Sequence, residues 1–335
     1  MRDLKKRITL VTLPCLLSFY AALTVFAGEE ERVFFSGFEN DSTMVGGPDL
    51  IGYDYSTGMD WVYDLDRWES QEGTDRIGYF TFDYGKNDTG TDLDRKVELA
   101  PGPENPENRV LKYWIKKANN PISTYPYSKG RIQSNLYNND GFENFTYSVR
   151  WYVPTDLNVL KDRVEKMPWM IVFEFWNNVD WRGEGYEFRI NVNLTKEYGS
   201  DQPFRLRAKA QKVIGWIDVW DVTNDFFEVP TGQWMTVRMQ YIVGNDESGR
   251  FYMDVKPDGG ARQVIFDITN FTHHPDDPAP NGVRDFNPIK MYCHKDVVDL
   301  VRNDATGKYL HFFWDDFEMW IKKDIFPRRK KYSRE

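Results

Sequence analysis

The sequence contains few cysteines. Of its 335 residues only two are cysteine. Cys15 lies in an apolar run near the N-terminus, so removal of that run would leave Cys293 alone and would exclude an intramolecular disulfide. A chain of roughly 300 residues can bury one large core without such cross-links. We therefore expect side-chain packing to provide the stability.

The chain also lacks an excess of positive charge. It has 43 Lys and Arg against 52 Asp and Glu, a formal net charge of −9 at pH 7. Nucleic acids are bound mainly through clustered Lys and Arg side chains. The acidic balance therefore argues against nucleic acid as a partner.

Only one long apolar run is present, and it lies at the N-terminus. Four basic residues within positions 2–7 precede an apolar stretch that ends near Ala27, and a polar chain begins at Gly28. A basic region, an apolar core and a small-residue cleavage site make up a secretory signal. We predict a signal peptide at 1–27, a secreted, periplasmic or cell-surface location, and no membrane association after cleavage. An uncleaved anchor is the alternative, because the run nearly reaches the length that spans a bilayer.

Aromatic residues and two-residue alternation are abundant. Aromatics make up 16% of the chain, and they favour strands. Many short alternating segments separated by turn residues predict an all-β protein, a jelly-roll sandwich of two antiparallel sheets. We expect one domain over 28–325 with long loops and edge strands at 40–108, a long loop at 270–285, and a basic tail at 326–335. Only two segments are predicted to be helical, 157–166 and 295–302.

The predicted strands collect cations, amides and aromatics on one face. In segment 170–176 we place Glu174 and Trp176 on the same face as Val172. Ile171 is expected on the opposite face. If the polar faces belong to one concave sheet, they line a locally basic groove, which favours a polyanionic ligand. An ordinary solvated sheet face is the alternative. The polar-face candidates for contact with substrate are Asn135, Trp176, Arg189, Asn191, Arg205, Arg207, Lys209 and Arg238.

The order of elements from about 130 to 320 resembles the concanavalin-like jelly-roll polysaccharide lyases, of the heparin-lyase and alginate-lyase type. The resemblance rests on segments such as KGRIQSN at 129–135, MIVFEFW at 170–176, PIKMYCH at 288–294 and WDDFEMW at 314–320. It implies that the protein cleaves a uronic-acid polysaccharide by β-elimination.

The resemblance also implies roles for individual residues. A cation or amide neutralises the uronate carboxylate in such lyases, and a Tyr or His moves the protons. Arg131, Gln133 and Lys290 would be the neutralising groups here. The central strand of these families offers a His as base, whereas this chain has Trp176 there, so Tyr292 or His294 would act as base or acid.

Other functions remain open at this level. A non-catalytic glycan-binding protein would use the same fold, and a glycoside hydrolase could use Glu174, paired with Glu187, as its carboxylates. Glu39 and Asp316 predict a structural Ca²⁺ site, because calcium prefers oxygen ligands. Zinc at His273 and His274 is a weaker alternative. The sequence indicates no organic cofactor.

Overall fold

The computed structural model describes residues 30–39, 42–44, 50–55, 57–61, 65, 77, 79–83, 91, 93–119, 128–177 and 185–322. The predicted signal peptide at 1–27 and the predicted basic tail at 326–335 lie outside these ranges. Within them, no helix is both long and apolar enough to cross a membrane.

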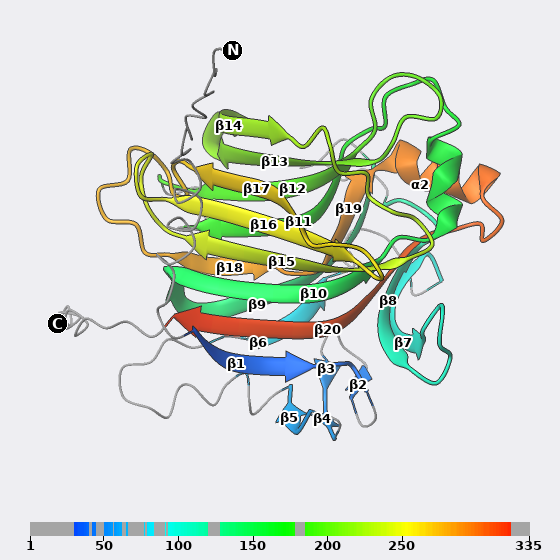
Figure 1. The fold of residues 1–335 in the computed structure, drawn as a ribbon, viewed down its shortest axis with the longest axis horizontal. Helices are drawn as coiled ribbons and strands as arrows, with labels where there is room; N and C mark the ends of the chain where they lie inside the picture. Colours follow the sequence, from blue (N-terminus) through cyan, green and yellow to red (C-terminus); the bar gives the residue numbers. More distant parts are fainter. Residues whose placement is uncertain are drawn as a thin grey trace, which may run out of the picture.

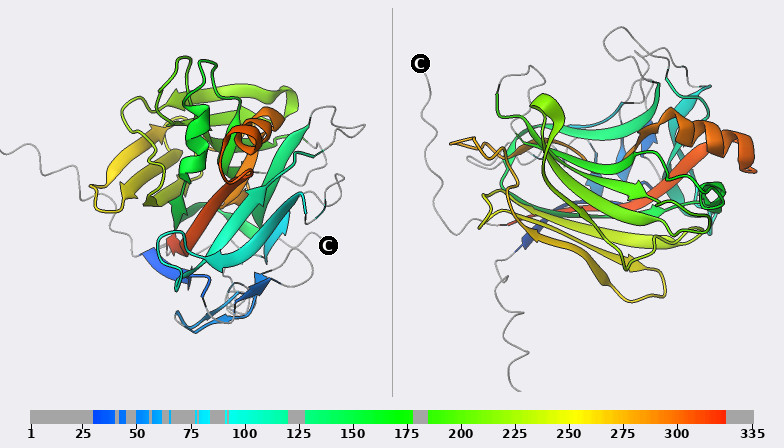
Figure 2. Two further views of the ribbon diagram at one scale, coloured as in Figure 1. Left: turned by 90° about the vertical axis from the view of Figure 1, so that its right-hand side faces the viewer. Right: turned by 90° about the horizontal axis from the view of Figure 1, so that it is seen from above.

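Two antiparallel sheets of eight strands each pack face to face (Figures 1 and 2). The first, which we call the outer sheet, has the order β17 (Gln263–Thr269), β16 (Arg250–Pro257), β15 (Trp234–Ile242), β10 (Asn144–Tyr152), β20 (Leu310–Lys322), β8 (Arg109–Ile115) and β7 (Arg95–Pro101), with β1 (Glu30–Ser36) paired to β20. The second, the groove sheet, has the order β14 (Ile217–Thr223), β13 (Arg205–Lys212), β12 (Phe188–Thr195), β11 (Met170–Asn177), β18 (Val283–Asn287), β9 (Lys129–Phe142) and β19 (Lys290–His294), with β6 (Tyr79–Asp83) paired to β9.

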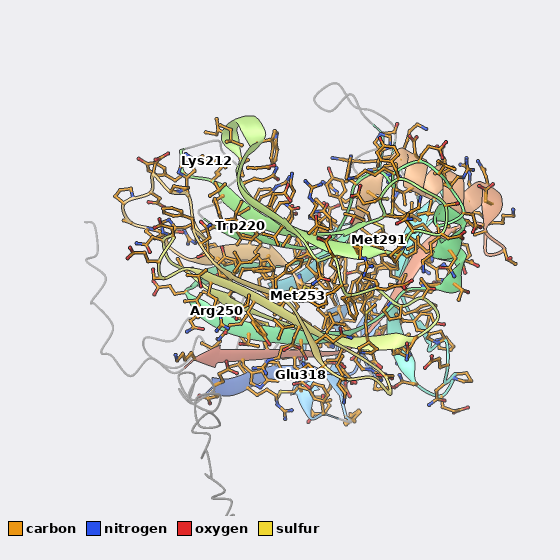
Figure 3. The ribbon with its side chains drawn as sticks, turned by 45° about the horizontal axis from the view of Figure 1, so that its top comes forward. Lys212, Trp220, Arg250, Met253, Met291 and Glu318 are labelled. Atoms are coloured by element: carbon orange, nitrogen blue, oxygen red, sulfur yellow. The ribbon has the colours of Figure 1, made fainter. Side chains whose placement is uncertain are left out.

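The chain passes repeatedly from one sheet to the other. It runs from β9 in the groove sheet to β10 in the outer sheet, returns for β11–β14, crosses for β15–β17, returns for β18 and β19, and ends in β20 of the outer sheet. The expectation of a jelly-roll sandwich of two antiparallel sheets is therefore confirmed. Figure 3 marks both layers, with Lys212 and Met291 in the groove sheet and Arg250 and Glu318 in the outer sheet.

Large aromatic side chains fill the space between the sheets. Alternate residues of β10 point inward, and Trp151 stacks on Trp314 of β20 with ring centres 5.5 Å apart. Phe173 of β11 meets Trp151 edge-on from the opposite sheet, with ring centres 5.8 Å apart. Such contacts stabilise the sandwich through burial of large apolar surfaces. The core-facing side of the groove sheet is therefore packed against the outer sheet.

Two helical segments lie at one end of the sandwich (Figure 1). The predicted helix at 157–166 is a shorter 3₁₀ helix, Thr155–Leu160, and the predicted helix at 295–302 is α2, Lys295–Asp304. The predicted loop at 270–285 ends earlier than expected, because β18 begins at Val283. Val283 and Phe286 are fully buried, so β18 is held by the core as well as by its neighbours β11 and β9.

Residues 40–108 contribute short strands. β6 joins the groove sheet and β7 ends the outer sheet, while two small hairpins lie beside β1 (Figure 1). The hairpin strands are β2 (Thr43–Met44), β3 (Leu50–Ile51), β4 (Tyr53–Asp54) and β5 (Met59–Asp60).

A β-bulge in β11 changes which residues face the groove. The register of β11 against β12 shifts between Ile171 and Phe173. Val172 consequently joins the core, and Ile171 lines the groove together with Glu174 and Trp176. The predicted assignment of Ile171 and Val172 to their faces was wrong, because strict alternation fails where one strand holds an extra residue.

Candidate functional site

An open groove of about 470 Å³ crosses the groove sheet. Five elements supply most of its lining: β9, β11, β12, β13 and β19. Its lining residues are Lys129, Arg131, Gln133, Trp169, Ile171, Glu174, Trp176, Arg189, Asn191, Asn193, Lys209, Gln211, Trp216, Lys290 and Tyr292. The sequence-predicted residues Arg131, Gln133, Glu174, Lys290 and Tyr292 are therefore brought together.

The register of β19 against β9 places the candidate catalytic groups beside each other. Tyr292 lies opposite Arg131, and Lys290 lies opposite Gln133. Directly opposed side chains in an antiparallel pair start from Cβ atoms about 4.5–5.5 Å apart. Arg131 also pairs with Asp83 of β6, with 2.8 Å between Nη2 and Oδ2. A cation and an amide thus lie next to the phenol.

Glu174 is the buried centre of the groove floor. Its side chain is 1% exposed, and it forms ion pairs with Lys290 of β19 and, at 2.9 Å, with Nη1 of Arg189 of β12. Trp176 donates a further hydrogen bond to it. Lys290 also donates to Oδ1 of Asn287 at 3.0 Å. The carboxylate therefore connects three strands of the sheet.

The pKa values of the central pair follow from burial and charge. Burial alone would raise the pKa of Glu174, but the positive charges of Lys290 and Arg189 outweigh it and hold that pKa below its usual value. Burial lowers the pKa of Lys290, and Glu174 opposes this shift. Glu174 is thus ionised at neutral pH, so it is a poor proton donor.

Arg189 is fixed by protein acceptors and covered by aromatic rings. Its Nε and Nη2 donate to Oε1 of Gln211 at 2.9 and 2.7 Å. Its guanidinium carbon lies 4.4 Å from the ring centre of Trp216 and 5.6 Å from that of Trp176. Asn191 also donates to Gln211, at 3.3 Å. Arg189 is therefore held in one position against the rings of Trp176 and Trp216.

The groove is locally basic on an acidic protein. Five cations line it, at positions 129, 131, 189, 209 and 290, against one carboxylate, Glu174, among the residues that the structure describes. Lys209 pairs with Asp218 at 2.8 Å and with Asp221 at 3.3 Å on the edge strand β14. On the β9 and β19 side, Arg131 pairs with Asp83 and Lys290 with Glu174, so the positive excess is one of lining cations over lining carboxylates.

Tyr292 lies among cations and a half-exposed tryptophan. The ammonium groups of Lys129 and Lys290 lie 5.3 and 5.1 Å from its ring centre. Trp169 packs edge-on against it, with ring centres 4.8 Å apart. The register of β11 against β19 places Ile171 opposite Tyr292. The phenol ring of Tyr292 is therefore flanked by two ammonium groups and by the ring of Trp169.

His294 has a different place from Tyr292. It is the N-cap of α2, where its Nδ1 accepts a hydrogen bond from the backbone N–H of Asp296 at 3.2 Å. It is not part of the groove lining. Capping uses the ring nitrogen that a base would need, so Tyr292 is the better placed of the two candidates.

Three further predicted contact residues lie in the groove sheet outside the lining. Asn135 of β9 accepts from Gln133 and from Asn287, both at 2.8 Å, and so supports the groove floor. Arg205 and Arg207 precede Lys209 in β13, nearer the start of the strand, and Arg207 pairs with Asp221.

Arg238 lies in the other sheet. It belongs to β15, between β10 and β16 of the outer sheet, and pairs with Glu30 at 3.3 Å. Arg238, predicted as a substrate contact, is therefore not in the sheet that carries the groove, and the condition that all the polar faces belong to one sheet fails for it. Alternation identifies the polar face of a strand, but the sheet that the strand joins depends on long-range pairing.

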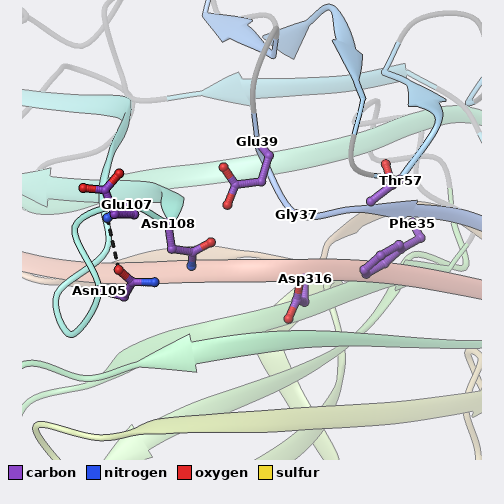
Figure 4. A pocket seen from close by; sticks show the side chains of 8 residues that line it. All are labelled: Phe35, Gly37, Glu39, Thr57, Asn105, Glu107, Asn108 and Asp316. Carbon is purple, nitrogen blue, oxygen red and sulfur yellow. Dashed lines mark hydrogen bonds between the residues drawn. The ribbon is translucent and has the colours of Figure 1, made fainter.

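Glu39 and Asp316 face a second pocket, of about 450 Å³, at the edge of the outer sheet (Figure 4). The oxygens of Glu39 accept from the backbone N–H of Arg109. Asn108 lines the pocket and donates to Oδ2 of Asp315 at 2.8 Å. Among the described residues no three Asp, Glu, His or Cys side chains are grouped so that they could hold a metal. Calcium at Glu39 and Asp316 therefore stays a prediction.

Six residues of the groove lining were not among the residues predicted from the sequence: Lys129, Trp169, Ile171, Asn193, Gln211 and Trp216. Asn193 and Gln211 occupy the polar faces of recognised strands and follow from alternation. Trp169 and Trp216 lie in connections rather than strands. The sequence does carry a signal for Trp216. It is a large apolar residue directly after Gly215 in a hairpin turn, where polar residues are usual.

No protein-family model matches the chain, and no curated protein does. Among solved structures, the chain is similar to an endo-β-1,4-glucuronan lyase from the fungus Trichoderma reesei, with 16% identity over 72% of this chain and 94% of that one and a TM-score of 0.42. It is also similar to the marine PL-14 alginate lyase from Aplysia kurodai (9% identity, 69% and 88% covered, TM-score 0.42). A third is the catalytic domain of a glycoside hydrolase family 131 protein from Coprinopsis cinerea (10% identity, 88% and 95% covered, TM-score 0.39). At these identities and scores the similarity assigns no activity to this chain.

Proposed function

We propose that this protein is an exported lyase that cleaves an acidic, uronic-acid-containing polysaccharide by β-elimination. The observation that supports the proposal is the arrangement of Arg131, Gln133 and Lys290 around Tyr292 in an open groove. Export rests on the predicted signal peptide at 1–27. The groove's positive lining, on a chain of net charge −9, favours a polyanion over a neutral glycan.

The chemistry requires that a C5 proton next to a carboxylate becomes acidic. Arg131 and Gln133 would bind the uronate carboxylate and stabilise the negative charge that develops on it. Tyr292 would take the C5 proton as its phenolate. The electron pair then forms the C4–C5 double bond while the C4–O4 bond breaks, and the leaving oxygen takes a proton from Tyr292 or from water. Lys129 and Lys290 would stabilise negative charge on the phenol oxygen electrostatically.

The geometry supports hydrolysis less well. Retaining and inverting glycosidases use two carboxyl groups on either side of the bond that is cleaved. Glu174 is the sole carboxylate in the groove lining among the described residues, and its ion pairs keep it ionised. Glu187 does not line the groove. We therefore assign Glu174 the role of holding Lys290 and Arg189.

The test is to incubate the purified protein with alginate, glucuronan, ulvan and glycosaminoglycans and to follow the ultraviolet absorbance of the unsaturated uronate product. A rise with at least one polymer, lost in Tyr292→Phe and kept in Arg238→Ala, is the expected result. Arg238 is a suitable control because it is a cation on the opposite sheet. No rise with any uronate polymer would contradict lyase activity. Retention of a polymer in an affinity gel without change in its length would indicate a non-catalytic glycan-binding protein.

A further inference from the structure

Trp216 has an unusual position for a large apolar residue. It ends the short 3₁₀ turn Ile214–Trp216 between β13 and β14, lines the groove, and remains 54% exposed. Turns are normally formed by glycine and polar residues, and large apolar side chains are normally buried. An exposed indole at the margin of a polar groove is suited to stacking on a ligand ring.

The backbone at Trp216 is held in an unfavourable conformation. Gly215 has φ 79° and Trp216 has φ 53°, so two successive residues are left-handed. Non-glycine residues rarely adopt this region, least of all bulky ones. Such strain persists where the surrounding structure enforces it, often at binding sites.

Arg189, the residue that lies against the ring of Trp216, is held in place by other side chains. Arg189, over which the indole lies at 4.4 Å, is held by Glu174 and by two hydrogen bonds to Gln211. Gln211 is itself fixed by Asp218, to which it donates at 2.6 Å. The indole is therefore preorganised, which reduces the entropy lost when a ligand binds.

Trp216 lies far from Tyr292 along the sheet. Tyr292 is opposite Ile171 of β11, whereas Arg189, beneath Trp216, is opposite Trp176. Along β12, which lacks the bulge of β11, four residues separate the backbone positions opposite Ile171 and Trp176, about 13 Å at ~3.3 Å per residue. That is longer than one sugar ring, so one monosaccharide cannot contact both.

We infer that Trp216 forms a remote subsite, which stacks on a sugar unit several positions from the bond that Tyr292 acts on. The inference rests on the proposed lyase function and adds to it that the groove recognises a polymer, not a short oligosaccharide. Chains too short to reach Trp216 gain nothing from it. Longer chains gain affinity from the indole face.

The experiment measures kcat/KM of the full chain on size-fractionated oligosaccharides of the uronate polymer that it cleaves, from dimers upward. The wild-type protein should show a rise in kcat/KM once the oligosaccharide reaches Trp216. In Trp216→Ala this rise should disappear, with KM for long chains up about tenfold (about 1.4 kcal/mol), whereas kcat/KM for the shortest substrate should change by a much smaller factor. Trp216→Phe should retain most of the rise, because an aromatic face remains.

Ile214→Ala is the matched control, because Ile214 is similarly exposed on the same turn but does not line the groove. It should leave the length dependence unchanged. A Trp216→Ala protein with wild-type length dependence would overturn the remote subsite while leaving the lyase proposal intact. If the wild-type protein cleaves no uronate polymer, the proposed lyase function itself fails, and the two failures are thus distinguishable.

Discussion

Replacement of Glu174 by Gln tests the charge balance of the groove floor. The side chains of Glu174 and Lys290 are 1% and 4% exposed, and that of Arg189 is 16% exposed. The substitution preserves shape but leaves Lys290 without its buried counterion. Removal of one partner from a buried ion pair costs about 3–5 kcal/mol, so we expect the free energy of unfolding at pH 7 to fall by about that amount.

The loss should depend on pH with a definite sign. Burial lowers the pKa of Lys290, and Glu174 opposes the shift, so the pKa of Lys290 should fall further in Glu174→Gln. A lysine whose pKa is lower in the folded than in the unfolded state reduces the free energy of unfolding. This reduction has its full size at pH values below the folded-state pKa. The reduction disappears as the pH rises toward the unfolded value of about 10.4. The difference between variant and wild type should therefore narrow between pH 7 and pH 10.

Urea unfolding followed by tryptophan fluorescence measures these differences. The double variant Glu174→Gln/Lys290→Met should recover most of the lost stability, because it removes both buried charges. Glu197→Gln is the control, since its ion pair with Lys166 is exposed on both sides and is worth less than about 1 kcal/mol. A loss under about 1 kcal/mol in Glu174→Gln, or a double variant no more stable than it, would refute the reasoning.

Three further predictions concern single groups. Tyr292→Phe should lower kcat by about 10²-fold or more with little change in polymer retention, measured by product absorbance and affinity gel; equal loss of both would mean a binding role alone. Burial and Asp316 raise the pKa of Asp315 to about 7, so stability should fall as pH rises from about 4 to about 7, by about 4 kcal/mol from this group. Asp315→Asn should flatten that part of the urea-unfolding profile, and an unchanged slope would contradict the assignment. If Ca²⁺ binds at Glu39 and Asp316, it should raise the melting temperature at pH 8 more than Mg²⁺ does, an effect that Glu39→Gln should remove.

The strands were largely predictable because their signal is local. In β9, β12, β13 and β19 alternate residues face the core, so alternation alone identified Arg131, Asn191, Lys209 and Lys290 as facing away from it. The pattern failed in β11, where an extra residue at the bulge places Ile171 in the groove. A bulge depends on the partner strand, which single-strand patterns do not contain.

The sequence by itself determined an acidic, all-β chain whose strands carry cations and amides on one face, because period-two alternation and composition are local properties. Only the tertiary structure decided which faces meet. Long-range pairing placed Arg238 in the outer sheet and brought Lys290 onto Glu174 across 116 residues of sequence. It also raised Trp216 over Arg189. These outcomes depend on which strands are neighbours, and neighbours are chosen by burial of the whole core rather than by any one segment.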